Sequence, residues 1–343
     1  MKKIFIFAAL MLGLASCQND NNIFGVNVNT NEEAVEFTIT ATAPEVVETR
    51  ADYETDSGKG GLKNVPLGGN KKLRYILEIY DRDNVRSEYI HYYYTTARQA
   101  VFTPRLVPNR KYTFVIWADI VETTLDGAST VKADDVHYNT GDLTNVTLKG
   151  DWNPMDETRD AFTGFEVVES LTTADADIDI ELTRPFAKIR VITTDVKEVA
   201  DLHITPTHAK VEYSTKHRAS FNAKSGEYGA ATETKAHGIF PIKTYTDNTN
   251  QQKVVFTDYF FAPETDTEKV NFTIYVYQAG VDDAANLINQ HTFNTNIPVK
   301  RNVLTTIIGN MLTIKDSFEI RGIVTDEDFA DERVFGLDGA EIL

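Results

Sequence analysis

Hydrophobic and polar residues alternate along much of the chain from Ala34 onward. The repeat is two residues rather than 3.6, which is typical of strands that bury one face. The alternating runs lie at residues 35–41, 73–79, 112–118, 178–182, 187–191, 270–276 and 318–320. Each run is short and bounded by Gly, Pro, Asn or Asp, as in antiparallel β-sandwiches. The pattern predicts an all-β protein, with short helices only at residues 195–202 and 282–289.

The spacing of the runs indicates two domains. A chain of 343 residues is long enough for two domains of about 150 residues, each with its own core. One series of strands ends near Asp195 and another begins there, so we expect an N-terminal β-sandwich at residues 34–195 and a C-terminal one at residues 196–343. A weakly patterned segment, residues 42–72, follows the first strand, and such long connections are often functional or flexible.

The N-terminus has the parts of a secretory signal. Met1-Lys2-Lys3 is basic, residues 4–14 are apolar, and Leu14-Ala15-Ser16-Cys17 ends on the only cysteine of the chain. The apolar run is too short for a permanent transmembrane helix. Because Leu-Ala-Ser-Cys resembles the lipobox of bacterial lipoproteins, we expect residues 1–16 to be removed and Cys17 to carry lipid. Residues 17–33 are polar and would form a tether.

The net charge and the cysteine count exclude several classes of function. The formal net charge is −17, which would repel nucleic acid, so no nucleic-acid partner is expected. A single cysteine rules out an internal disulfide and a cysteine-based metal site.

The residues that usually carry chemistry show no catalytic or metal-binding pattern. The seven histidines lack the spacing of a metal-binding helix and are expected on loops. Asp175, Asp177 and Asp179 lack the glycine and the final glutamate of a calcium loop, and we expect them on the solvated face of a strand. We therefore predict no catalytic residue, no metal, no cofactor and no enzyme activity.

Several segments resemble one family of surface proteins. After the lipobox and a short alternating strand comes Glu48-Thr49-Arg50-Ala51. The more specific matches are residues 182–189 and 297–310, and weaker ones are residues 112–120 and 160–162. Together they resemble the fimbrillin-like subunits of Bacteroidetes fimbriae, also called type V pilins. The resemblance implies two tandem transthyretin-like antiparallel β-sandwich domains, with residues 182–189 closing the first domain.

The resemblance also implies assembly by strand exchange. In the family, an arginine-specific protease cuts after the first strand, and here Arg50-Ala51 occupies that position. The first strand then leaves, and a strand from a neighbouring subunit fills the groove through main-chain bonds and alternate side chains. The expected leaving strand carries Val35, Phe37, Ile39 and Ala41, and the expected donor strand carries Phe318, Ile320, Gly322 and Val324.

Each of these assignments has an alternative. Residues 317–324 are equally consistent with an ordinary last strand of the second domain, since a charged stretch follows them. Arg50 is equally consistent with a solvated linker residue.

Two hypotheses for function follow. The first is a fimbrial subunit, lipid-anchored at the outer membrane and exposed at the cell surface or in a fimbrium, with a role in adhesion. Its partners would be other fimbrial subunits or further copies of the chain, and an arginine-specific protease. The alternative is a glycan-binding surface lipoprotein, in which Trp152, Tyr92 and Tyr94 would stack on sugar rings.

Overall fold

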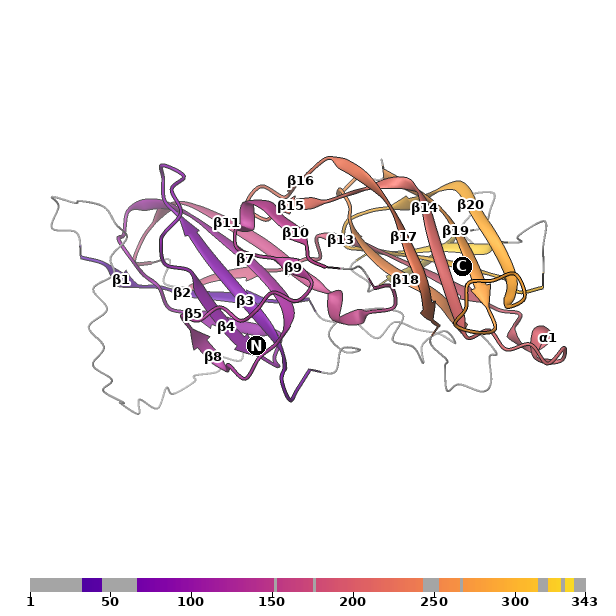
Figure 1. Ribbon diagram of the computed structural model, residues 1–343. Helices are drawn as coiled ribbons and strands as arrows, with labels where there is room; N and C mark the ends of the chain where they lie inside the picture. Colours follow the sequence, from indigo (N-terminus) through magenta and orange to yellow (C-terminus); the bar gives the residue numbers. More distant parts are fainter. Residues whose placement is uncertain are drawn as a thin grey trace, which may run out of the picture.

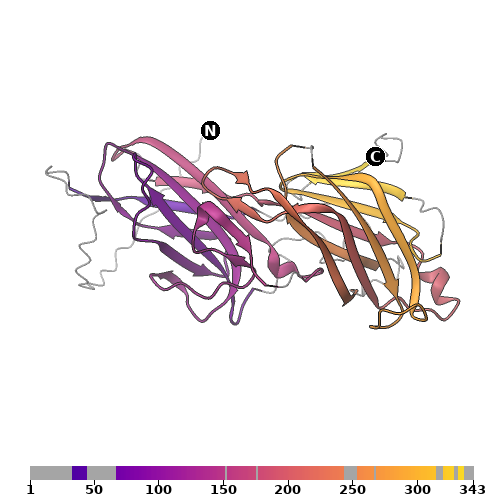
Figure 2. The same cartoon turned by 45° about the horizontal axis from the view of Figure 1, so that its top comes forward.

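The computed structural model describes residues 33–44, 67–150, 153–174, 177–242, 253–265, 268–313, 320–327 and 331–335. Nearly all regular structure in these residues is β-strand, which confirms the prediction of an all-β protein. The strands form two bodies that lie side by side, as both orientations show (Figures 1 and 2). The finer expectation of transthyretin-like domains stays a prediction.

The first body contains a five-stranded sheet, a three-stranded sheet and a short two-stranded pair. The five-stranded sheet has the order β11 (Ala161–Leu171), β7 (Arg110–Glu122), β3 (Lys71–Tyr80), β4 (His91–Thr95) and β8 (Gly127–Ser129). The three-stranded sheet has the order β12 (Asp177–Glu181), β2 (Thr38–Thr42) and β5 (Gln99–Phe102). The pair joins β1 (Val35–Glu36) to β6 (Arg105–Leu106). Apolar side chains from these sheets form one buried cluster between them.

The second body contains a five-stranded and a four-stranded sheet. The five-stranded sheet has the order β18 (Lys253–Phe261), β13 (Phe186–Thr193), β21 (Val303–Gly309), β22 (Ile320–Glu327) and β23 (Asp331–Phe335). The four-stranded sheet has the order β17 (Ala231–Pro241), β14 (His208–Arg218), β19 (Glu268–Tyr277) and β20 (Leu287–Val299). A second buried apolar cluster lies mainly between these sheets.

A small sheet joins the two bodies. Its order is β16 (Glu227–Tyr228), β15 (Ser220–Asn222), β10 (Val146–Leu148) and β9 (Tyr138–Asn139), so two of its strands precede residue 186 and two follow it. A third buried cluster lies beside it and is rich in aromatic rings. Trp117 from β7 lies 6.4 Å from both Phe186 and Phe221, measured between ring centroids. The two bodies therefore share a packed interface.

Strand pairing places the change of body earlier than the sequence suggested. The expectation that residues 182–189 close the first domain is wrong, because Phe186–Thr193 pairs with β18 and β21 of the second body. The boundary expected near Asp195 accordingly lies after the first strand of the second body. All eight residues of this strand are buried, so its pattern gave no sign of which body it joins.

The sheets are not purely antiparallel, contrary to expectation. β2 runs parallel to β12, and β13 runs parallel to β21. Sequence alternation reports which face a side chain occupies but not the direction of the neighbouring strand, so parallel pairs escaped the prediction.

Helical structure in the described residues is limited to one short α-helix and two 3₁₀ turns. The helix α1 (Val196–Ala200) lies within the helix expected at residues 195–202. The 3₁₀ turns are η2 (Leu143–Asn145) and η3 (Glu157–Arg159). The helix expected at residues 282–289 is wrong: the Asp283 carboxylate accepts a hydrogen bond from the Asn286 backbone at 2.8 Å, which makes a turn, and β20 then begins.

Candidate functional site

The expected leaving strand lies in the middle of its sheet. β2 is hydrogen-bonded to antiparallel β5 on one side and to parallel β12 on the other, and we call these three strands the β2 sheet. Ile39 stands between Phe102 of β5 and Ile178 of β12. Beyond the ladder, the Phe37 backbone N–H donates to the Pro104 carbonyl at 3.0 Å. Loss of β2 would therefore leave unpaired backbone groups on both flanking strands.

The side chains of this segment divide into a buried and an exposed set. Phe37, Ile39, Ala41 and Ala43 are at most 2 % exposed and belong to the core of the first body. Val35 was expected in the buried set, but it is 38 % exposed. The alternation loses its phase between β1 and β2, where two consecutive residues of β1 face solvent.

The core is tight at one end of the β2 sheet. A Cβ atom added to Gly164 of β11 would lie 2.9 Å from Leu182 Cδ2 and 3.0 Å from Ile180 Cγ2. Both contacts are closer than ordinary van der Waals separations, so a glycine is needed where β11 crosses this end of β12. Small side chains at Ala41, the partner of Ile180, suit this restricted space.

The outer face of the β2 sheet is acidic on one strand and hydroxylic on the next. Asp177, Asp179 and Glu181 are exposed on β12, with Ile178 and Ile180 buried between them. They pair in register with the half-buried Thr38, Thr40 and Thr42. The expectation of a solvated acidic face therefore holds for Asp177 and Asp179, while Asp175 lies outside the described residues.

Other expected functional residues fall outside the described part of the chain. These are the signal segment 1–16, Cys17 and most of the tether, the cleavage pair Arg50 and Ala51, and Phe318. The rest of the expected donor strand lies in β22, where Ile320 pairs with Gly309, Gly322 with Ile308 and Val324 with Thr306 of β21. In a single copy, this segment is thus a strand of the second body, and donation stays a prediction.

The structure also brings together charged residues that the sequence analysis missed. Arg184 donates two hydrogen bonds to Asp160, from Nε and Nη2, each 2.8 Å long. Both side chains are buried, so this is a bidentate ion pair shielded from water. It links the start of β11 in the first body to the segment that leads into β13.

A second buried pair lies beside the first and also bridges the two bodies. Glu157 of η3 accepts hydrogen bonds from Lys188 Nζ of β13 and from the Tyr259 hydroxyl of β18, each at 2.7 Å. The Asp156 side chain begins η3 by accepting the Thr158 N–H at 3.0 Å, which holds Glu157 in place. Burial lowers the pKa of Lys188, against the attraction of Glu157.

Asp258 of β18 is the centre of a third buried group. Its carboxylate lies 3.1 Å from Arg159 Nη1 of η3 and 2.8 Å from His237 Nε2 of β17, and it accepts the Tyr213 hydroxyl at 2.8 Å. Burial would raise the pKa of Asp258, but His237 and Arg159 outweigh burial and hold that pKa below its ordinary value. These contacts fix η3 of the first body against the second.

The expectation that the histidines lie on loops is wrong for several of them. His217, His237 and His291 lie on strands and are buried. The sequence did not indicate that these histidines are buried, because other parts of the folded chain cover them. Within the described residues, no group of three or more His, Cys, Asp or Glu side chains could hold a metal ion.

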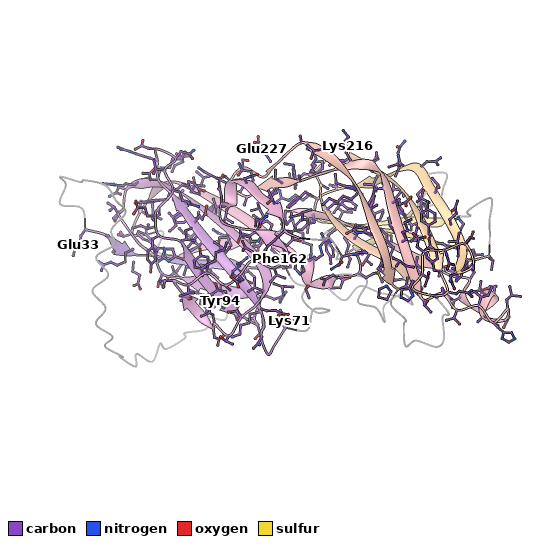
Figure 3. The ribbon with its side chains drawn as sticks, in the orientation of Figure 1. Glu33, Lys71, Tyr94, Phe162, Lys216 and Glu227 are labelled. Atoms are coloured by element: carbon purple, nitrogen blue, oxygen red, sulfur yellow. The ribbon has the colours of Figure 1, made fainter. Side chains whose placement is uncertain are left out.

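Two tyrosines named for sugar stacking are inaccessible. Tyr92 and Tyr94 of β4 are buried, and Tyr94 (labelled in Figure 3) donates from its hydroxyl to the Val131 carbonyl at 2.9 Å. Their role as stacking platforms is therefore wrong, because the loop around Val131 covers Tyr94 and alternation alone did not reveal this cover. Trp152 lies outside the described residues.

The relationship of the chain to known proteins rests on a family model. The model of a family of unknown function, DUF6562, matches residues 27–340. The chain belongs to this family. No curated protein matches this DUF6562 chain.

The DUF6562 chain is similar to solved structures from Parabacteroides distasonis and Bacteroides ovatus. A fimbrial assembly protein from Parabacteroides distasonis is 13% identical, with a TM-score of 0.43, over 89% of this chain and 100% of that one. A protein from Bacteroides ovatus, provisionally described as a cell adhesion protein, is 14% identical, with a TM-score of 0.45, over 84% and 98% of the two chains. At these TM-scores the likeness does not carry those functions over.

None of the helices in the described residues has the length and apolar character needed to cross a bilayer.

Proposed function

We propose that the chain is a cell-surface subunit whose precursor is held at the outer membrane by lipid on Cys17 and which, after cleavage at Arg50, assembles into fimbriae by strand exchange at β2. The central observation is the position of β2 between β5 and β12, with the side chains of Phe37, Ile39, Ala41 and Ala43 buried in the core of the first body. A strand of matching alternation can take over both ladders and the same buried positions. The proposal assigns no catalytic step to the chain.

The position of β2 in the sequence supports its release. Glu33, which precedes β1 and β2 in the chain, lies at the end of the first body that is far from the second body (Figure 3). Arg50 lies in the sequence between β2 and β3, so a cut after Arg50 would leave the segment joined to the body by non-covalent contacts alone.

The replacement strand would come from residues 318–324 of a neighbouring copy or subunit. Those residues carry an apolar side chain or glycine at every second position, as β2 does. Because residues 320–327 pair with β21 in a single copy, donation requires their release from the second body.

Cleavage of the purified chain with an arginine-specific protease tests the proposal. We expect a fragment that ends at Arg50, followed by multimers detectable by size-exclusion chromatography, and no multimers from Arg50→Ala. Persistence of monomers after complete cleavage at Arg50 would contradict the proposal.

A peptide competitor tests the site itself. A peptide of residues 33–44 should slow multimer formation by occupying the groove between β5 and β12. The same peptide with Ile39→Arg is the matched control, because a charged side chain cannot enter the core. Equal inhibition by the two peptides would show that the groove is not the assembly site.

Lipid attachment is tested separately. Cells that express the chain in the presence of labelled palmitate should label it, and Cys17→Ser should abolish the label. Labelling of Cys17→Ser would move the anchor to another residue.

A further inference from the structure

The exposed position of Val35 changes how a donor strand would align with the β2 sheet. This inference rests on the proposed function and deepens it by naming the alignment. Phe318, Ile320, Gly322 and Val324 can replace the series that begins at Val35, or the series Phe37, Ile39, Ala41 and Ala43. The two alignments differ by two residues and keep the same faces buried.

Burial disfavours the alignment that begins at Val35. It would place Phe318 at a site that is 38 % exposed and Gly322 at the fully buried site of Ile39. It would also place Asp326 at the site of Ala43, which is 0 % exposed. The first change exposes an aromatic ring, the second leaves a void in the core, and the third buries a carboxylate without a partner.

The alignment that begins at Phe37 keeps the two large buried side chains of the segment in place. Phe318 takes the place of Phe37 and Ile320 that of Ile39, so the two large buried residues are unchanged. Gly322 then takes the place of Ala41, at the end of the sheet where β11 needs Gly164 to pass β12. Val324 takes the place of Ala43 and is the one member that adds volume.

Charge on β12 distinguishes the two alignments. Thr40 is the partner of Asp179 and Thr38 the partner of Asp177 in the parallel ladder. A strand that begins at the Phe37 site brings Arg321 beside Asp179 and Glu319 beside Asp177. The other alignment brings Arg321 beside Asp177 and Glu319 beside Arg105, the partner of Glu36. Charge alone favours that second alignment, because it has two attractive pairs where the first has one attractive and one repulsive pair, but burial decides against it.

We propose that residues 318–324 of a second copy enter the β2 sheet parallel to β12, with Phe318 at the Phe37 site and Arg321 beside Asp179. Burial sets this alignment, and Asp179 is then the acceptor residue that stabilises it through a cross-strand pair with Arg321 on the exposed face. Asp177 opposes the same strand, because it meets Glu319.

Charge reversal at the two aspartates gives opposite expectations. Asp179→Lys should weaken assembly of the cleaved protein by about three- to thirtyfold, because an attractive pair becomes a repulsive one. Asp177→Lys should leave assembly unchanged or strengthen it. Arg321→Asp should weaken assembly, and its combination with Asp179→Lys should restore it. Each variant is first shown by circular dichroism to be folded as a monomer.

Cysteine cross-linking reads the alignment directly and does not depend on energies. All chains carry Cys17→Ser, so the introduced cysteines are the only ones. Cleaved acceptor with Asp179→Cys should form a disulfide with donor Arg321→Cys, and acceptor with Asp177→Cys should form much less.

The outcomes separate this inference from the proposed function. Cross-linking through position 177, or weakening by Asp177→Lys alone, would overturn the alignment while leaving strand exchange intact. Unchanged assembly of both Asp177→Lys and Asp179→Lys would overturn the role of Asp179. Normal assembly of Phe318→Asp would overturn donation by this strand and with it the proposed function.

Discussion

β2 of the first body and β13 of the second lie in corresponding places in their sheets, but the two strands are held differently. β2 lies between antiparallel β5 and parallel β12, and β13 lies between antiparallel β18 and parallel β21. β13 has eight residues, all buried, whereas β2 has five that alternate between buried and half-buried. One topological position thus holds a strand covered on both faces and a strand covered on one.

The polar residues of the two strands account for the difference. On β2 they are threonines beside the exposed carboxylates of β12. On β13, Lys188 is buried against Glu157, and Arg190 Nε donates to Thr306 Oγ1 at 3.1 Å. Removing β13 would leave the buried Glu157 without its partner Lys188, whereas removing β2 exposes an apolar groove. Strand exchange is therefore more favourable at β2 than at β13.

The largest expected effect comes from breaking an ion pair next to β13. Arg184→Met leaves Asp160 buried without its bidentate partner and should lower the free energy of unfolding by about 3–5 kcal/mol. Urea denaturation of the full chain measures it. Arg184→Met combined with Asp160→Leu should recover much of the loss, and a loss below about 1 kcal/mol in the single variant would show that the pair does not anchor this strand.

The free energy of unfolding of the chain should fall in acid because of the buried His217. Burial lowers the pKa of His217 to about 4 from its ordinary 6.5. Below pH 6.5 His217 binds a proton in the unfolded chain but stays neutral in the folded chain. The contribution of neutral His217 to stability is therefore complete above pH 6.5 and is lost as pH falls towards 4. The linked loss is at most about 3 kcal/mol. His217→Gln should flatten the curve of unfolding free energy against pH in this window, and an unchanged curve would contradict the assignment.

Hydrogen exchange compares the two strands directly. We expect amides of residues 38–42 to exchange about tenfold faster or more than those of residues 188–193, because the β2 sheet has three strands and one solvated face. Mass spectrometry of the uncleaved chain resolves both segments. Equal protection of the two segments would show that exposure of one face to solvent does not speed exchange in β2.

The smallest effect is expected on the outer face of the β2 sheet. Asp179→Asn removes an exposed charge and should change the free energy of unfolding of the monomer by no more than about 0.5 kcal/mol. Thermal unfolding checks this value. A larger loss would mean that Asp179 stabilises the single copy and does not act in assembly alone.

The sequence predicted strands well and their surroundings poorly. Of the alternating runs predicted at residues 35–41 and 178–182, all apolar members but Val35 are buried, because period two is a local property. Lys188 and Arg190 also alternate with apolar residues, yet both side chains are buried, Lys188 against Glu157 of η3, which only the tertiary structure reveals. The same limitation hid the pairing of Arg184 with Asp160, although both residues stood in motifs quoted for their resemblance.

The sheet shared by the two bodies has a mechanical consequence. β10 and β15 are hydrogen-bonded across the junction, and the rings of Trp117, Phe186 and Phe221 pack beside them. A tensile force applied to one end of the molecule is transmitted to the other end through this packed interface as well as through the covalent chain that connects the two bodies. A filament built from such units would lengthen little under tension, since each unit would behave as a stiff link without a hinge at its middle.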